Sequence, residues 1–280
     1  MTTELELGAF YRETRERLGY TQRDVESAYC NHSLISRFEN GETVLRADKL
    51  LLAINGLDMT PTEFFVSHGN YQPNRLQIFN QKMSRYIIIE DIEGLKKLLK
   101  PRANKKQDKI FNILVKCAIF DLSDEMLVTK SERQFIERHF TEIKQWTIHE
   151  VNVFAQCLEV LEDADAYDIG QDILKSDEYS KIITANAETV KKTLLNLYVH
   201  LVCHSSYRYA DKLKESINQF ITEWDIEEKI ILYLFEKFSL YKKEKSPELL
   251  EEIQDDIQNL TRYGATGIAK RLAMFIEKSC

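Results

Sequence analysis

The 280-residue sequence has few residues that break helices, only nine glycines and four prolines. So low a number argues against a fold of many short strands and turns and favours long helices. No run of about 18 apolar residues occurs, which is the length that a membrane-spanning helix needs, so we expect no membrane span. The N-terminal stretch MTTELELGAF is acidic where a signal peptide is basic, which predicts a cytoplasmic protein.

Paired cysteine spacings are also absent, because the five cysteines are scattered along the chain. This pattern predicts reduced thiols. His200 and His204 lie one helical turn apart with Cys203 nearby, but no further ligand stands at a telling spacing, so we expect a structural or surface role and no metal. HEVNV at 149–153 lacks the second histidine of a zinc-protease motif, and no glycine-rich phosphate loop is present. We therefore expect no cofactor and no enzyme.

The formal net charge of −7 argues against non-specific binding of nucleic acid, so any DNA-binding role has to rest on a local site. Apolar residues make up 44% of the chain, enough for a substantial core, and the length favours more than one domain. The pattern predicts an all-α protein with a domain at 1–66, a helical linker at 67–110 and a helical-repeat domain at 111–280. The basic run at 95–109 within that linker is interpreted as a solvated helix face.

Residues 1–66 read as five short helices with recognisable ends. Thr21 is a good N-cap for the second helix and Asn31 for the third, which Gly41 ends. Thr60 and Glu63 form a capping box at the start of the fifth. Helices this short are not stable alone, so they must pack on one another.

The stretch LGYTQRDVESAYCNHSLISRFENGE, at 18–42, resembles the helix-turn-helix of the XRE (lambda/434 repressor-like) class. The matching features are the opening Thr21-Gln22, the apolar Val25 and the segment from Ser33 to Gly41. The turn YCN is one residue shorter than is usual in that class and has no glycine. The resemblance implies that Arg15 forms a structural ion pair with Glu39.

A recognition helix enters the major groove of DNA with its N-terminal residues, where polar side chains reach base edges. Arg37 is the candidate for a bidentate contact to guanine. Gln22 is placed to give its amide and its backbone N–H to a phosphate. The full set of candidate DNA-binding residues is Gln22, Arg23, His32, Ser33, Ser36, Arg37, Asn40, Arg46 and Lys49. The alternative is that these residues form the solvated face of a small bundle.

Beyond residue 131 the sequence reads as one helix after another. The expected segments are 131–145, 147–163, 165–175, 188–204, 206–222, 227–243, 247–261 and 264–278. The apolar positions of 190–202 match those of 227–239 at an offset of 37, and each stretch precedes a shorter amphipathic helix. Paired helices that repeat at about this length predict a tetratricopeptide-like solenoid with a concave groove.

This layout, together with FEN before Gly41, QWTIHEVNVF at 145–154 and KTLLNLYVHL at 192–201, resembles the Rgg/GadR/MutR regulators. The resemblance implies a homodimeric transcription regulator that binds double-stranded promoter DNA and a short hydrophobic signalling peptide in quorum sensing. It also implies dimerisation through the repeat domain.

Asparagine offers both a donor and an acceptor to the backbone of a bound peptide. Asn152 and Asn196 stand in mid-helix, where asparagine is locally unfavourable, so they are the first candidates for a peptide site. The alternative is a hydrogen bond between helices of the solenoid. Four aromatic residues complete the candidate set, and the alternative for them is ordinary core packing. They are Phe154, Tyr198, Tyr233 and Phe235.

Two functions therefore compete, with an enzyme as a weaker third. The first is a transcription regulator gated by a short apolar peptide. The second is a helix-turn-helix repressor whose helical domain binds another protein, with no peptide pheromone. Stabilisation of the folded protein by a short apolar peptide favours the first.

Overall fold

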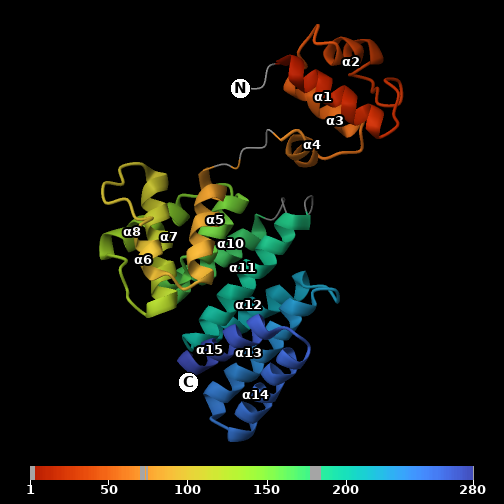
Figure 1. Cartoon of the computed structure of the whole chain (residues 1–280). Coiled ribbons are helices and arrows are strands. Elements are labelled where there is room, and N and C mark those ends of the chain that lie inside the picture. The colour runs from red at the N-terminus through yellow and green to blue at the C-terminus, as the bar shows by residue number, and fades with distance from the viewer. Residues whose placement is uncertain (1–3, 70–72, 74, 177–183, 280) are drawn as a thin grey trace. The chain divides into compact units, whose positions relative to one another are not determined.

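The computed structural model describes residues 4–69, 73, 75–176 and 184–279, and every regular element among them is a helix (Figure 1). The expected all-α class is therefore confirmed. The chain divides into two compact units, residues 1–81 and 82–280, and the division falls inside α5 (Arg75–Ile88). The stretch proposed as a linker, 67–110, is thus shared between the two units.

The first unit is a small helical bundle. Its helices before α5 are α1 (Glu4–Arg17), α2 (His32–Glu39), α3 (Ala47–Asn55) and α4 (Pro61–Ser67). The helix expected to begin at Thr21 is not formed, which corrects the five-helix description. Residues 22–25 instead form hydrogen-bonded turns, and Ser27 and Cys30 exchange two backbone hydrogen bonds that close the loop before α2.

The remaining helix starts follow the expected capping chemistry. The side chain of Asn31 accepts a hydrogen bond from the backbone N–H of Leu34 at 3.0 Å and caps α2. Thr60 and Glu63 form the reciprocal capping box at the start of α4. Gly41 follows α2 with a φ of 72°, a left-handed conformation that glycine adopts without strain.

The core of the first unit is aromatic and tightly packed. Tyr11, Phe38 and Phe64 are buried, and the Tyr11 hydroxyl donates to the carbonyl of Ala53 at 3.0 Å. Gly8 lets α1 approach α2, because a Cβ there would lie 2.0 Å from the carbonyl oxygen of Phe38. Helix α2 is thus held against α1 by shape as well as by burial.

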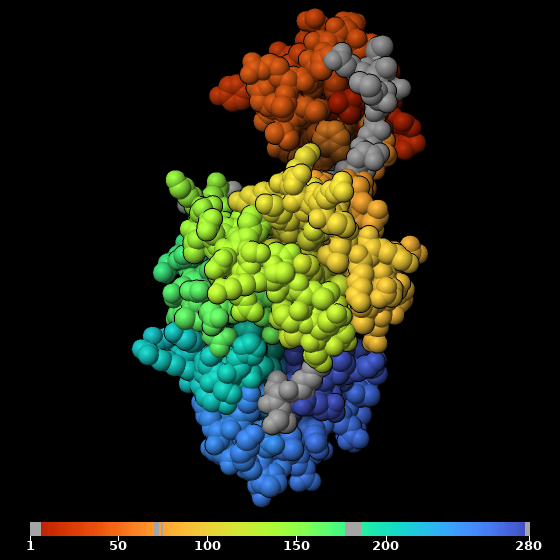
Figure 2. Space-filling model, turned by 90° about the vertical axis from the view of Figure 1, so that its left-hand side faces the viewer, coloured from red at the N-terminus to blue at the C-terminus, as the bar shows by residue number. Residues whose placement is uncertain are grey.

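The second unit is an array of helices that follow one another along the chain (Figures 1 and 2). After α5 come α6 (Ile92–Lys96), α7 (Lys106–Ser123), α8 (Lys130–Thr141), α9 (Ile148–Ala155), the 3-10 turn η1 (Leu158–Val160), α10 (Asp163–Lys175), α11 (Thr184–Cys203), α12 (Tyr207–Phe220), α13 (Ile226–Glu244), α14 (Pro247–Arg262) and α15 (Thr266–Ser279). The single helix expected over 147–163 is therefore divided, since α9 ends at Ala155.

The expected repeat is visible in the packing. Helix α11 packs against α9, α12 and α13, while α13 packs against α14 and α14 against α15. The stretches 190–202 and 227–239, whose apolar positions match at an offset of 37 residues, lie in α11 and α13. Each of these helices is followed by its partner in the repeat, α12 or α14. Tyr198 and Phe235 occupy equivalent positions in these pairs, and both are buried. No helix among the described residues is long and apolar enough to cross a membrane.

Candidate DNA-binding face and repeat surface

Helix α2 separates an inward face from an outward face, as a recognition helix does. Ile35, Phe38 and Glu39 are buried against the rest of the first unit. His32, Ser33 and Arg37 are exposed, and Ser36 is half-buried. The candidate base-reading side chains therefore share the free side of the helix.

A buried ion pair holds α2 in place. Arg15 of α1 donates from Nε and Nη2 to the two carboxylate oxygens of Glu39, at 2.6 and 2.9 Å, and also donates to the carbonyl of Tyr20. Its hydrogen bond to Glu39 raises the pKa of the Arg15 guanidinium. Gln22 donates its side-chain amide to Glu39 at 2.7 Å.

The structure thus gives Gln22 a different setting from the expected one. Its amide is engaged with Glu39, and its neighbours form turns, so no helix dipole stands behind it. The group of Gln22 that remains a candidate donor to a DNA phosphate is therefore its backbone N–H. The amide instead fixes the turn that precedes α2.

Several candidate cations have a carboxylate nearby. The pairs are His32–Glu26 at 2.9 Å, Arg37–Glu42 at 3.9 Å, Arg46–Asp48 at 3.4 Å and Lys49–Asp48 at 3.8 Å. Except for Lys49, these side chains are at least two-fifths exposed, so each pair is weak in water. The acidic partners lower the positive potential that this face offers to phosphates.

Exposed Arg23 and Asn40 complete the candidate set, one in the turns before α2 and the other at its C-cap. Sequence reasoning missed Tyr29, whose side chain is 74% exposed and lies under the ammonium group of Lys49, 5.3 Å from the ring centre. Its exposure depends on tertiary packing, so no sequence signal singled it out. Cys30 in the same loop is buried, and burial raises the pKa of its thiol, so this cysteine is poorly suited to be reactive.

Three of the candidate peptide-binding aromatics belong to the core. Phe154 and Phe235 have no exposed surface and Tyr198 is 2% exposed. Phe154 packs edge-on against Phe140 and Trp146. The groove-lining role expected for these three side chains is thereby corrected to core packing.

The other three candidates are accessible to different degrees. Asn152 is half-buried and donates its amide to the carbonyl of Ile148 at 2.7 Å, a bond within its own helix. Asn196 on α11 is exposed, and Tyr233 on α13 is 53% exposed. These last two positions are equivalent in the 37-residue repeat.

Helix α13 also carries an apolar stripe that the sequence alone did not single out. Ile226, Tyr233 and Leu240 follow one another at intervals of seven residues, and their exposed fractions are 64%, 53% and 42%. Residues at this spacing lie close to one side of a helix. Tyr233 thus belongs to this stripe, and α13 packs against α11, the helix that carries Asn196.

A capped helix with a polar outward face, on a small bundle followed by a helical array, is the arrangement that the sequence predicted for a transcription regulator with a helical-repeat domain. The family model of the C-terminal domain of the helix-turn-helix transcriptional regulator Rgg matches residues 95–273, and a helix-turn-helix domain model matches residues 6–64. The chain belongs to the Rgg family of transcription regulators.

Solved structures share this fold over nearly the whole chain. The SHP pheromone receptor Rgg2 of Streptococcus dysgalactiae is 18% identical, with a TM-score of 0.78 over 98% of this chain and 100% of that one. PrgX, in its complex with iCF10, is 13% identical, with a TM-score of 0.71 over 98% of this chain and 96% of that one. At these identities the likeness shows a shared fold and nothing further.

Proposed function

We propose that this protein binds specific double-stranded promoter DNA through α2 and that a short apolar peptide, bound by the repeat domain, controls the outcome. The observation that carries the proposal is the pairing of two surfaces on one chain. One is the polar free face of a helix fixed by the Arg15–Glu39 pair. The other is the exposed apolar stripe on α13.

The DNA-binding part rests on side-chain chemistry at α2. Arg37 supplies the planar fork that matches guanine, while Ser33 and His32 near the helix start supply short polar groups for base edges. Arg23, Arg46 and Lys49 provide phosphate contacts from neighbouring segments. The first 66 residues hold seven basic and eleven acidic side chains, so the DNA-binding unit of one protein copy attracts DNA only weakly. Tight binding therefore needs two copies of the protein, each on one half-site of the operator.

The peptide-binding part rests on Asn196 and on the stripe of Ile226, Tyr233 and Leu240. An apolar peptide covers the stripe, and the amide of Asn196 pairs with one peptide unit of its backbone. Equivalent positions on successive repeats suit an extended ligand, because each repeat presents the same kind of contact to the next part of the peptide.

Homodimerisation is proposed to occur through the repeat domain. The terminal helix α15 carries two large apolar side chains that are partly exposed, Met274 at 43% and Phe275 at 48%. A second copy that covers them removes apolar surface from water, which is the main driving force for association. The two DNA-binding units of a dimer then address a palindromic operator.

The first test is fluorescence-polarisation binding of the purified full-length protein to labelled short hydrophobic peptides encoded beside its own gene. The proposal expects saturable binding that unlabelled peptide competes away and that Asn196→Ala weakens at least tenfold. The matched control is Asn218→Ala, an exposed asparagine on α12 that lies outside the stripe. Circular dichroism checks that both variants remain folded.

Promoter DNA from the same locus is titrated in parallel. Binding of DNA without binding of any peptide contradicts the peptide-gated function and favours a repressor whose helical domain binds a protein. Peptide binding that is equal in the Asn196→Ala variant and in the wild type places the ligand elsewhere. Absence of DNA binding at low salt, with peptide bound or free, contradicts the role of α2.

A further inference from the structure

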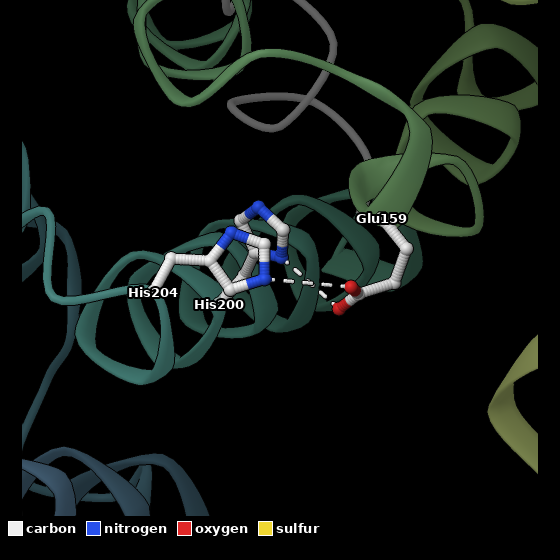
Figure 3. Close-up of side chains that lie close together, drawn as sticks. All are labelled: Glu159, His200 and His204. Atoms are coloured by element: carbon white, nitrogen blue, oxygen red, sulfur yellow. Dashed lines mark hydrogen bonds and ion pairs between the residues drawn. The ribbon is translucent and has the colours of Figure 1, made fainter. Parts of the chain in front are cut away.

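Two histidines and two carboxylates meet where α10 begins and α11 ends. His200 lies in the last turn of α11 and His204 directly follows the end of that helix, while Glu159 lies in η1 and Asp163 is the first residue of α10 (Figure 3). A nitrogen from each histidine and an oxygen of Glu159 all lie within 4.8 Å of one another. His200 is 41 residues from Glu159, so folding alone supplies the third ligand that sequence spacing did not show.

The distances on the Glu159 side suit a small cation. His200 Nδ1 lies 3.1 Å from Glu159 Oε1, and His204 Nε2 lies 3.5 Å from Glu159 Oε2. With metal–ligand bonds of about 2.0–2.1 Å, neighbouring ligand atoms of a tetrahedral zinc ion stand roughly 3.3 Å apart. Both rings turn a nitrogen toward the same carboxylate (Figure 3).

The opposite nitrogens of both rings face Asp163. Its Oδ1 lies 3.3 Å from His200 Nε2 and 3.1 Å from His204 Nδ1, while its Oδ2 accepts a hydrogen bond from the hydroxyl of Ser206. A metal-binding histidine usually directs its second nitrogen to a carboxylate, which fixes the tautomer and the ring orientation. Asp163 does this for His204, and it also lies close to His200 without the geometry of a hydrogen bond.

Without a metal, the cluster is a crowded set of charges. The centres of the two imidazole rings lie 3.9 Å apart, and the ring planes are tilted by 48°. A single divalent cation between the two rings and Glu159 would neutralise the charge of the carboxylate. His200 is moreover buried, and its Nε2 makes no hydrogen bond to any described residue.

We propose that Glu159, His200 and His204 bind a divalent transition-metal ion of the zinc class, with Asp163 orienting His204. Two imidazoles and one carboxylate favour zinc, cobalt, nickel or copper over calcium or magnesium. The side chains of Glu159 and His204 are 34% and 39% exposed, so solvent reaches the fourth coordination position. The ion joins η1 and α10 to the end of α11 and therefore stabilises the folded repeat domain.

The test uses the full-length protein, freed of metal by a chelator and dialysed. Isothermal titration with zinc chloride is expected to show one tight site per chain. His204→Gln and Glu159→Gln are each expected to weaken zinc binding at least tenfold, because each removes one of three protein ligands. Both side chains are partly exposed, so these variants avoid disturbing the core. Asp163→Asn is expected to weaken binding by about 10–100-fold while leaving all three ligands in place.

The matched control is His32→Gln, since His32 also pairs with a carboxylate, Glu26 at 2.9 Å, but has no second histidine beside it. Its zinc affinity is expected to equal that of the wild type. Cobalt(II) in place of zinc gives a second readout, an intense visible absorption band that reports a four-coordinate site. The thermal midpoint is expected to rise with zinc in the wild type and not in His204→Gln.

Two results would overturn the proposal. One is the absence of a stoichiometric zinc site in the folded, metal-free protein. The other is a site whose affinity is the same in the wild type, His204→Gln and Glu159→Gln, since the metal would then be held by other residues, such as the cysteines.

Discussion

Glu39, the last residue of α2, accepts two hydrogen bonds from Arg15 of α1, at 2.6 and 2.9 Å, and its side chain has no exposed surface. The same carboxylate accepts the amide of Gln22. The buried carboxylate of Glu39 therefore connects α1, the turns at 22–25 and α2. The orientation of α2 depends on this junction, so its removal is expected to affect both stability and DNA binding.

Replacing Arg15 by Met is expected to destabilise the first unit by about 3–5 kcal/mol, because it leaves the charge of Glu39 buried without its main partner. Both tryptophans, Trp146 and Trp224, lie in the second unit, so tryptophan fluorescence does not report this change directly. Hydrogen exchange of α1 and α2 amides in the full-length protein measures it. The double variant Arg15→Met/Glu39→Leu removes both charges and is expected to recover most of the stability. A double variant as unstable as the single one would contradict this account.

Arg37→Ala is expected to weaken binding to the cognate operator by about 1–3 kcal/mol, the discrimination that one good bidentate contact provides. The fold is expected to stay intact, since the side chain is exposed. The control is Arg17→Ala, an exposed arginine at the end of α1 that pairs with Glu13. Polarisation titrations with operator and with scrambled DNA separate specific from non-specific binding. Equal operator affinity for Arg37→Ala and the wild type would remove Arg37 from the site.

Glu26→Gln is expected to strengthen DNA binding severalfold. The carboxylate of Glu26 lies 2.9 Å from His32 and repels the phosphates that approach the start of α2. Glutamine keeps a side-chain oxygen that can still accept the backbone N–H of His32, so the helix start is preserved. Glu13→Gln, on α1, makes the same change of charge away from the proposed face. If both variants bind DNA equally well, only net charge matters, and the local role of Glu26 is wrong.

Local chemistry made much of the fold predictable. The caps at Asn31 and Thr60 depend on neighbouring residues only, and both are formed as expected. The repeat was predictable as well, since the apolar pattern recurs at an offset of 37 residues. The turns at 22–25 were not, because Thr21 and Asp24 have the residue types of a helix start and bond to each other reciprocally. The loop that follows is closed instead by two backbone hydrogen bonds between Ser27 and Cys30, which are three residues apart and give no signal in the residue types.

The candidate site was less predictable, because it depends on which side of each helix meets another helix. Asn196 and Tyr198 are two residues apart in one apolar stretch, yet one is exposed and the other buried. The meeting of Glu159 with His200 depends wholly on tertiary packing. Residue types alone could not assign these roles.

Gly8→Ala is expected to destabilise the first unit by about 1–3 kcal/mol, the usual effect of overpacking. The new Cβ would lie 2.0 Å from the carbonyl oxygen of Phe38, a backbone atom that cannot move aside cheaply. The control is Gly267→Ala in α15, where an added Cβ meets nothing within 4 Å. That substitution is expected to be neutral or to stabilise the protein by up to about 1 kcal/mol. Hydrogen exchange in α1 and α15 compares the two, and equal effects would contradict the close approach of α1 to α2.

The start of α8 is expected to make the second unit sensitive to acid. Glu132 caps α8 with Thr129 and accepts two contacts from the ammonium group of Lys116, at 2.6 and 2.7 Å. Burial disfavours its charged form, but the hydrogen bonds from Lys116 and Thr129 outweigh burial and lower the pKa of Glu132 below its ordinary value of 4.5. A carboxyl whose pKa is lower in the folded state stabilises the fold above its ordinary pKa, and the stabilisation is lost as the pH falls through the folded value.

Glu132→Gln tests this dependence. At pH 7 the variant is expected to be less stable by about 1.5 kcal/mol, because a charged partner of Lys116 is lost. The difference is expected to shrink as the pH falls below 4.5 and to vanish once Glu132 is protonated in the folded wild type. Urea unfolding followed by tryptophan fluorescence suits the measurement, since Trp146 stacks on Phe140 of α8. A difference that stays constant from neutral to acidic pH would show that the ionisation of Glu132 contributes nothing.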